Sequence, residues 1–232
     1  GLVRGEAVTA PVDVTSGDAL KIRQARQTWA EHVRKGGFVM IPLLLVGALA
    51  AILALRKAID LSRVRVRAGA VVDEILAHIQ AGEIDAARSA AQRLREPLAM
   101  LMTAGIDLRD APREHLEEIL HEHVLGYVPR LERHLGMLAV FGGMAPLLGL
   151  LGTVTGMIHT FQLVTIFGSG DARLLSGGIS EALIATEFGL AIAIPVLLVH
   201  ALLVRRVKTH VAALEQNAAG LVNGLTVRTR RS

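Results

Sequence analysis

The sequence predicts an all-α membrane protein with three transmembrane helices and a large helical cytoplasmic insert between the first and the second. The mean hydropathy of +0.47 and the apolar content of 52% are too high for a domain of this length that faces only water. Long uncharged stretches alternate with strongly charged ones instead of mixing at helical spacing, which is typical of a chain that crosses a bilayer several times.

The basic balance of the chain does not indicate nucleic acid. The net charge is +4, but the basic residues cluster at the ends of apolar segments. One Trp, one Tyr and five Phe leave little aromatic surface on which bases could stack. Positive flanks of membrane spans explain the charge more simply, so the expected partner is a lipid bilayer and not a nucleic acid. The absence of cysteine excludes disulfides and thiol catalysis.

Residues 1–36 are predicted to form an N-terminal arm that begins polar and continues as a short amphipathic helix. Trp29 would lie near the headgroup level, although an ordinary packing role is an equal alternative. The chain begins at Gly1 instead of Met, which suggests a processed or truncated N-terminus.

The first transmembrane helix is predicted at residues 37–55. These nineteen residues carry no charge and are followed directly by Arg56 and Lys57. At about 1.5 Å per residue they can cross roughly 30 Å of hydrocarbon. A buried core helix is the alternative.

Residues 56–134 are charged and helix-favouring, with apolar residues at helical spacing, and they predict a cytoplasmic helical domain. We expect Gly82, Pro97, Gly105 and Pro112 to divide it into several helices. The stretch 114–124 combines histidines with glutamates, which could bind a metal, but a charge-paired, solvated helix face is the favoured interpretation.

The second half of the chain predicts two further spans. Residues 135–170 contain no Asp, Glu, Lys or Arg, which places a second transmembrane helix at 135–164 and a loop at 165–175. The third transmembrane helix is predicted at 176–204, and a C-terminal tail at 205–232.

Basic residues gather after the first span and after the third, so the positive-inside rule places the insert and the C-terminus in the cytoplasm. The N-terminus is then periplasmic. Basic residues before the first span, such as Arg34 and Lys35, oppose this orientation.

A stripe of small residues follows one face of the second span, with Gly149, Gly152, Thr153, Gly156 and Thr160 three or four residues apart. Such a stripe lets helix backbones approach closely in lipid. Spacing alone does not separate a special site from a generic packing face.

Two carboxylates, Glu181 and Glu187, interrupt the apolar third span. A charge at mid-bilayer costs at least about 3 kcal/mol, so such residues usually face a bundle interior or water and often mark an ion path. Six residues separate them by about 120° around a helix, so we expect them not to share one face. As alternatives, Glu181 is simply hydrated near the outer end of the span, and Glu187 pairs with an Arg or Lys of another chain.

Thr186 and Pro195 lie in the same span. A hydroxyl and a loosened backbone ladder would suit a hydrated proton path, although a threonine often bonds a carbonyl of its own helix. No catalytic triad, phosphate-binding loop or metalloprotease motif occurs at usable spacing, so we predict neither an enzyme nor a bound metal or cofactor.

Two motifs, APLLGLLGTVTGMIHTF at 145–161 and GGISEALIATEFGLAIAIP at 177–195, resemble the core of the ExbB/TolQ/MotA proton-channel family. The likeness covers residues from about 25 to 215, and three spans favour an ExbB or TolQ type. It implies a ring, usually a homo-pentamer, in the bacterial inner membrane. Single-span helices of an ExbD-like partner would occupy its pore, and proton passage would drive a TonB-like protein in outer-membrane uptake of iron complexes.

The resemblance also implies roles for residues. The matching pore-lining hydroxyls are Thr153 and Thr186, the matching acid is Glu181, and the helix-shaping prolines are Pro146 and Pro195. Glu187 departs from the family pattern, in which a small or apolar residue is common.

Two alternatives to an ExbB-like motor subunit stay open. A TolQ-like subunit for envelope maintenance would share every motif quoted above. A purely structural membrane scaffold would use the small-residue stripes only for packing.

Overall fold

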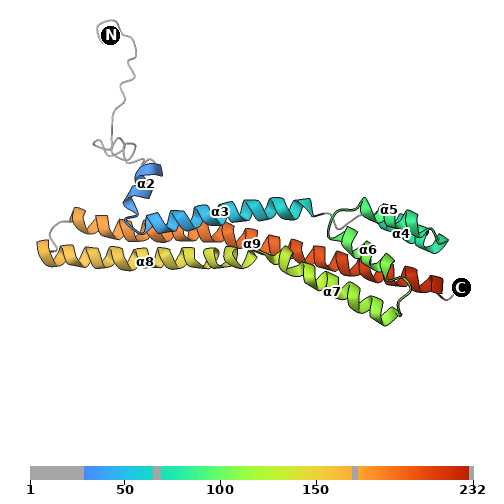
Figure 1. The fold of residues 1–232 in the computed structure, drawn as a ribbon. Helices are drawn as coiled ribbons and strands as arrows, with labels where there is room; N and C mark the ends of the chain where they lie inside the picture. The colour runs from blue at the N-terminus through green and yellow to red at the C-terminus, as the bar shows by residue number, and fades with distance from the viewer. Residues whose placement is uncertain (1–28, 65–68, 169–171, 230–232) are drawn as a thin grey trace, which may run out of the picture. The chain divides into compact units, whose positions relative to one another are not determined.

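The computed structural model describes residues 29–64, 69–168 and 172–229, and their regular secondary structure is entirely helical (Figure 1). Three stretches are long and apolar enough to cross a membrane, namely Met40–Arg63, Arg113–Phe167 and Leu175–Thr226. These observations confirm the all-α class and the three candidate spans. Most of the predicted N-terminal arm lies outside the described residues.

The described chain forms two compact units. Of the described residues, the first combines 29–41 with 149–168 and 172–187, and the second combines 42–64 and 69–148 with 188–229. Each of the three long apolar stretches has residues in both units.

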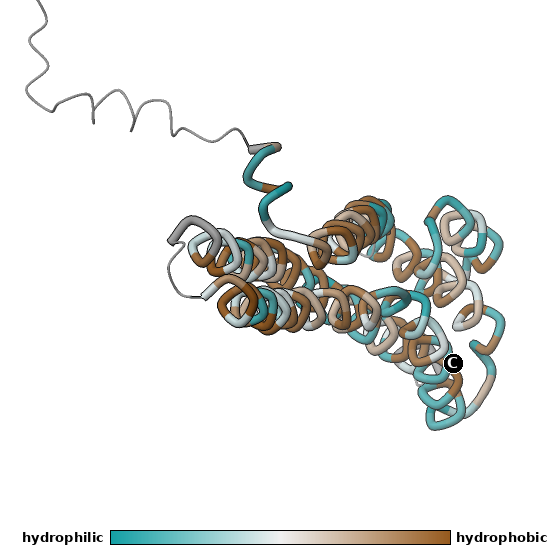
Figure 2. Tube along the Cα trace, turned by 90° about the vertical axis from the view of Figure 1, so that its left-hand side faces the viewer, coloured by the Kyte–Doolittle hydropathy of each residue, from teal (hydrophilic) through white to brown (hydrophobic). Residues whose placement is uncertain are grey.

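In the first unit, α2 (Trp29–Lys35) is a short helix that ends in a glycine turn before α3 (Met40–Arg63). Gly37 adopts a φ of 72°, a left-handed conformation that favours glycine. Figure 2 shows α2 as a hydrophilic helix leading into the apolar start of α3. The polar-to-apolar change therefore falls at the turn.

The other two long helices are α8 (Leu135–Phe167) and α9 (Ala172–Thr229). Helix α8 contains no Asp, Glu, Lys or Arg, so it can lie in hydrocarbon without burying the charge of such a side chain. Helix α9 has 58 residues and does not end at Val204, the predicted end of the third span. Most of the predicted C-terminal tail is thus a continuation of the same helix.

Four helices form the insert in the second unit: α4 (Gly69–Ala81), α5 (Ile84–Gln92), α6 (Leu98–Asp107) and α7 (Arg113–Glu132). Gly82 lies between α4 and α5, and Pro97 and Pro112 directly precede α6 and α7. The expectation for Gly105 was wrong. This glycine lies inside α6, where a Cβ atom would collide with Leu221 of α9.

The insert has an apolar core to which the end of α9 contributes. Its fully buried side chains lie on the inward faces of amphipathic helices. The largest of them are Ile75, Ile79, Leu98, Met102, Ile106, Leu120, Val124, Leu214 and Leu221. The C-terminal half of α9 therefore completes the insert.

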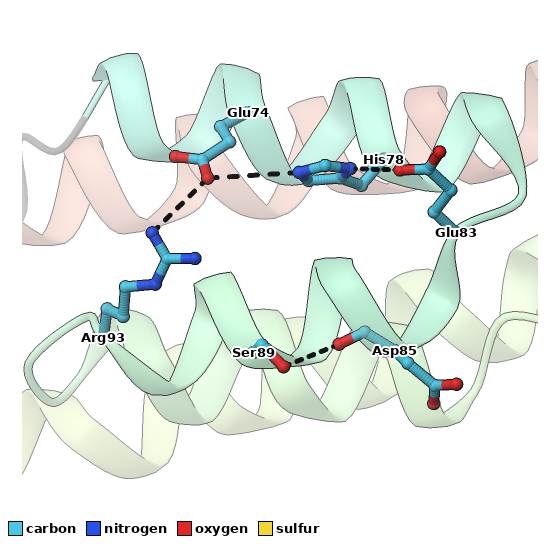
Figure 3. A network of polar contacts seen from close by, with 6 residues as sticks. All are labelled: Glu74, His78, Glu83, Asp85, Ser89 and Arg93. Carbon is cyan, nitrogen blue, oxygen red and sulfur yellow. Dashed lines mark hydrogen bonds and ion pairs between the residues drawn. The ribbon is translucent and has the colours of Figure 1, made fainter.

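Polar contacts on this insert are exposed. Figure 3 shows His78 between two carboxylates, with Nδ1 2.7 Å from Glu83 and Nε2 4.0 Å from Glu74, which also lies 3.5 Å from Arg93. Exposed ion pairs of this kind contribute little, typically about 0–1 kcal/mol each. On α7, His115 lies 4.0 Å from Glu118. Among the described residues no cluster of three or more His, Asp or Glu is arranged to hold a metal ion.

Candidate functional site

The small-residue stripe of α8 packs directly on α9 within the first unit. Gly152 and Gly156 are buried, and a Cβ atom at Gly152 would collide with the Cβ of Ala185. A Cβ at Gly156 would lie 2.9 Å from the Cβ of Ala182, closer than real Cβ atoms approach. Only glycine allows the two helix backbones to lie this close together.

A hydroxyl joins the same two helices. Thr186 Oγ1 on α9 donates a hydrogen bond to the backbone carbonyl of Gly149 on α8, at 3.1 Å. Thr153 behaves differently, because its Oγ1 donates to the carbonyl of Leu150 in its own helix, at 2.7 Å. The two hydroxyls singled out from the sequence thus have different partners, one between helices and one within a helix.

Glu181 lies against the glycine turn that precedes α3. A Cβ atom at Gly37 would overlap the carboxylate of Glu181, and one at Gly36 would lie 3.1 Å from Ile184 Cγ2. The residue at position 37 must therefore adopt a positive φ and leave space for the half-buried carboxylate of Glu181, and glycine does both.

Glu187 pairs with an imidazole of its own chain. Its Oε2 lies 3.1 Å from His32 Nε2 on α2, and the side chains of His32 and Glu187 are 28% and 60% exposed. His32 is thus a partner of Glu187 within the chain, and a pair of Glu187 with an Arg or Lys of another chain stays a prediction.

The two carboxylates, which the sequence predicts not to share one face of α9, nevertheless contact the same neighbouring segment. Although they lie on different sides of α9, Glu181 and Glu187 both contact residues 32–37. His32 of α2 makes one of these contacts, and Gly37 in the turn after α2 makes the other. Neither His32 nor Gly37 was predicted from the sequence as a site residue.

The two helix-shaping prolines belong to the second unit. Pro146 lies inside α8 and Pro195 inside α9, and both helices continue through them. Each proline lacks an N–H and so removes one hydrogen bond from the helical ladder.

The fold and this site define a multi-pass helical membrane protein in which carboxylates and hydroxyls lie at close contacts between long apolar helices. Residues 91–216, more than half of the chain, match the MotA/TolQ/ExbB proton channel family. The chain belongs to this family, and it is therefore a non-enzymatic transport motor subunit.

Relatives carry names from two branches of the family. ExbB-like protein 1 of Synechocystis sp. is 36% identical over 174 residues, which cover 73% of this chain and 68% of the relative. ExbB-like protein 3 of the same organism is 30% identical over 165 residues, covering 70% and 79% of the two chains. The Tol-Pal system protein TolQ of Haemophilus influenzae is 32% identical over 104 residues, covering 45% and 44%.

Proposed function

We propose that this chain is the ExbB-like, proton-conducting subunit of an inner-membrane motor that uses the proton motive force to power TonB-dependent outer-membrane transport. The observation that carries this proposal is the position of Thr186 and Glu181, a hydroxyl and a carboxylate on one apolar helix of a proton-channel family member. ExbB-like relatives match a larger share of the chain than TolQ does, which favours the ExbB-like role.

The chemistry of these side chains suits proton transfer. A carboxylate accepts and releases a proton, and a hydroxyl both donates and accepts a hydrogen bond. Thr153 is half-buried and keeps acceptor capacity beyond its bond to Leu150. In this proposal Glu181, Thr186 and Thr153 line the path, and Glu187 is a second proton-carrying group.

A complete path requires more than one chain. Only 28–33% of the apolar 18-residue segment of each candidate span is buried within this chain. Large apolar side chains on α3, α8 and α9 are therefore left for lipid or for neighbouring subunits. We propose a homo-oligomeric ring, a pentamer by family analogy, around an ExbD-like single-span partner that contributes a protonatable Asp. The N-terminus would be periplasmic and the insert cytoplasmic.

The assembly can be tested by native mass spectrometry and cryo-electron microscopy of the full chain, alone and with the co-expressed ExbD-like partner. A ring that encloses the partner helix supports the proposal. A monomer or open dimer that ignores the partner would contradict it and favour a structural scaffold.

Conduction can be tested by proton flux into vesicles that contain the chain and its partner. Glu181→Gln, Thr153→Val and Thr186→Val should each abolish most of the flux at unchanged protein level. His115→Gln, a change of an exposed imidazole on α7, should not alter it. Wild-type flux in all three path variants would favour the scaffold.

A TolQ-like role in envelope maintenance is the second candidate, supported by the TolQ relative. Affinity purification of the full complex distinguishes the two roles. Recovery of a TonB-like protein supports the ExbB-like role, and recovery of a TolA-like protein supports the other.

A further inference from the structure

The imidazole of His32 is a titratable group at the candidate site to which no role has yet been assigned. It belongs to α2, before the first span, yet its Nε2 lies 3.1 Å from Glu187 Oε2 on α9. The side chain of His32 is 28% exposed within this chain.

The contacts of the neighbouring residues 36 and 37 show where the His32–Glu187 pair lies along α9. Residue 37 begins the uncharged stretch of the first span, and it lies against Glu181, while Gly36 lies against Ile184. His32 precedes that stretch in the sequence, yet it contacts α9 at Glu187, six residues beyond Glu181. Thr186, bonded to α8, is the direct neighbour of Glu187 in the chain.

We propose that His32 is a further residue of the proton path, which exchanges protons between water on the α2 side and the carboxylate of Glu187. This proposal rests on the proposed function, since it assumes that the chain conducts protons. Imidazole suits the role because one ring nitrogen can accept a proton while the other donates one.

The step balances without a further reactant. A hydronium ion delivers a proton to Nδ1 of the neutral ring whose hydrogen is on Nε2, which releases water and makes an imidazolium. The Nε2–H proton then passes to Glu187 Oε2, which leaves a neutral imidazole and a neutral carboxyl group. Glu187 gives the proton onward along the path and returns to a carboxylate, and the ring exchanges its hydrogen through water from Nδ1 back to Nε2 before the next cycle.

Other charged groups near the pair set its electrostatic surroundings. On α2 these are Glu31, Arg34 and Lys35, and on the facing part of α9 the other acid is Glu181. In the first unit, α8 carries a single titratable side chain, His159, and the start of α3 carries none. Among the described residues of this unit, the charged and titratable groups that accompany His32 and Glu187 are therefore Glu31, Glu181, Arg34, Lys35, Arg173 and His159.

The test compares His32→Gln and His32→Arg with wild type in vesicles of phosphatidylethanolamine and phosphatidylglycerol that contain the full chain and its ExbD-like partner. Flux is measured with an internal pH-sensitive dye between pH 5 and 8. Glutamine keeps a hydrogen-bonding group, and arginine keeps the ion pair with Glu187 but cannot release a proton. Both variants should lower the flux about tenfold or more, since a positioned proton-transfer group typically contributes roughly 10²–10⁴-fold.

Arginine separates proton exchange from simple clamping of α2 to α9. Wild-type flux and an unchanged pH profile in His32→Arg would overturn the proposal and leave His32 with a structural role. Loss of flux in Glu181→Gln and Thr186→Val, with normal flux in both His32 variants, would refute the role of His32 and leave the proposed function intact. Normal flux in all four variants would refute both. His115→Gln is the matched histidine control, and protein level and oligomer size are measured for every variant.

Discussion

Two helix contacts in this chain are built in opposite ways. Where α8 meets α9 in the first unit, the contact is made by Gly152, Gly156, Ala182 and Ala185, and an added methyl group would not fit. The core of the insert is instead filled by large side chains such as Ile75 and Met102, which are fully buried.

The kind of contact that stabilises a pair of helices depends on whether water or lipid surrounds them. In water, burial of large apolar side chains drives association at about 25 cal/mol per Å². In lipid that driving force between helices is absent, because the surrounding chains are as apolar as leucine, so close backbone packing and hydrogen bonds must hold the helices together. This chain has large buried side chains in the insert core and close backbone packing between α8 and α9.

The largest expected effect is truncation in the insert core. Ile75→Ala should lower the free energy of unfolding by about 2–5 kcal/mol, because it leaves a cavity at a fully buried site. Thermal unfolding in detergent, followed by circular dichroism, measures the change. Met100→Ala at a 42% exposed position of α6 is the control and should change little. Equal losses in both variants would mean that the insert does not depend on this core.

The inverse change should destabilise the α8–α9 contact. Gly152→Ala adds one methyl group that collides with Ala185, and it should cost about 1–3 kcal/mol through overpacking. Gly143→Ala in the same helix meets no atom within 4 Å. It should be neutral or stabilising by about 0.5–1 kcal/mol, since alanine favours a helix. Equal stability of Gly152→Ala and Gly143→Ala in the same unfolding assay would contradict the predicted overpacking at Gly152.

The glycine turn gives a smaller effect with a functional readout. Gly37 and Gly168 have similar φ angles, 72° and 75°, but only Gly37 has a close neighbour, the carboxylate of Glu181. Alanine at either position should cost about 1–2 kcal/mol in a left-handed conformation. Only Gly37→Ala should also reduce proton flux, because it displaces Glu181. Reduced flux in both variants would argue against a specific role of the contact between Gly37 and Glu181.

The smallest expected effect concerns the single hydrogen bond between the helices. Thr186→Val removes the bond to Gly149 and should cost about 0.6–1.7 kcal/mol, the range of such bonds in membranes. Thr186→Ser keeps the hydroxyl and should restore most of this stability. Thr153→Val is the second control, since its bond lies within one helix. A loss that serine does not recover would assign the effect to packing.

Much of the fold could be predicted from the sequence, because long uncharged stretches identify candidate spans and proline or glycine separates helices. The continuation of α9 was harder to predict, since Arg205, Arg206 and Lys208 resemble the end of a span. A helical apolar pattern does follow them, in Leu214, Leu221 and Leu225, and it becomes meaningful only once the insert is seen to cover it. Gly105 was misjudged for a similar reason, because its contact with Leu221 is distant in sequence.

By itself, the sequence determined the class of the protein, its apolar segments, and the presence of Glu181, Glu187 and Thr186 in one of them. Those features depend on local composition and periodicity, which the solvent of each segment dictates. Only the tertiary structure decided the partners, which are Gly37 for Glu181, His32 for Glu187 and the Gly149 carbonyl for Thr186. Such contacts join residues far apart in the chain, so they follow from how helices pack and not from any local pattern.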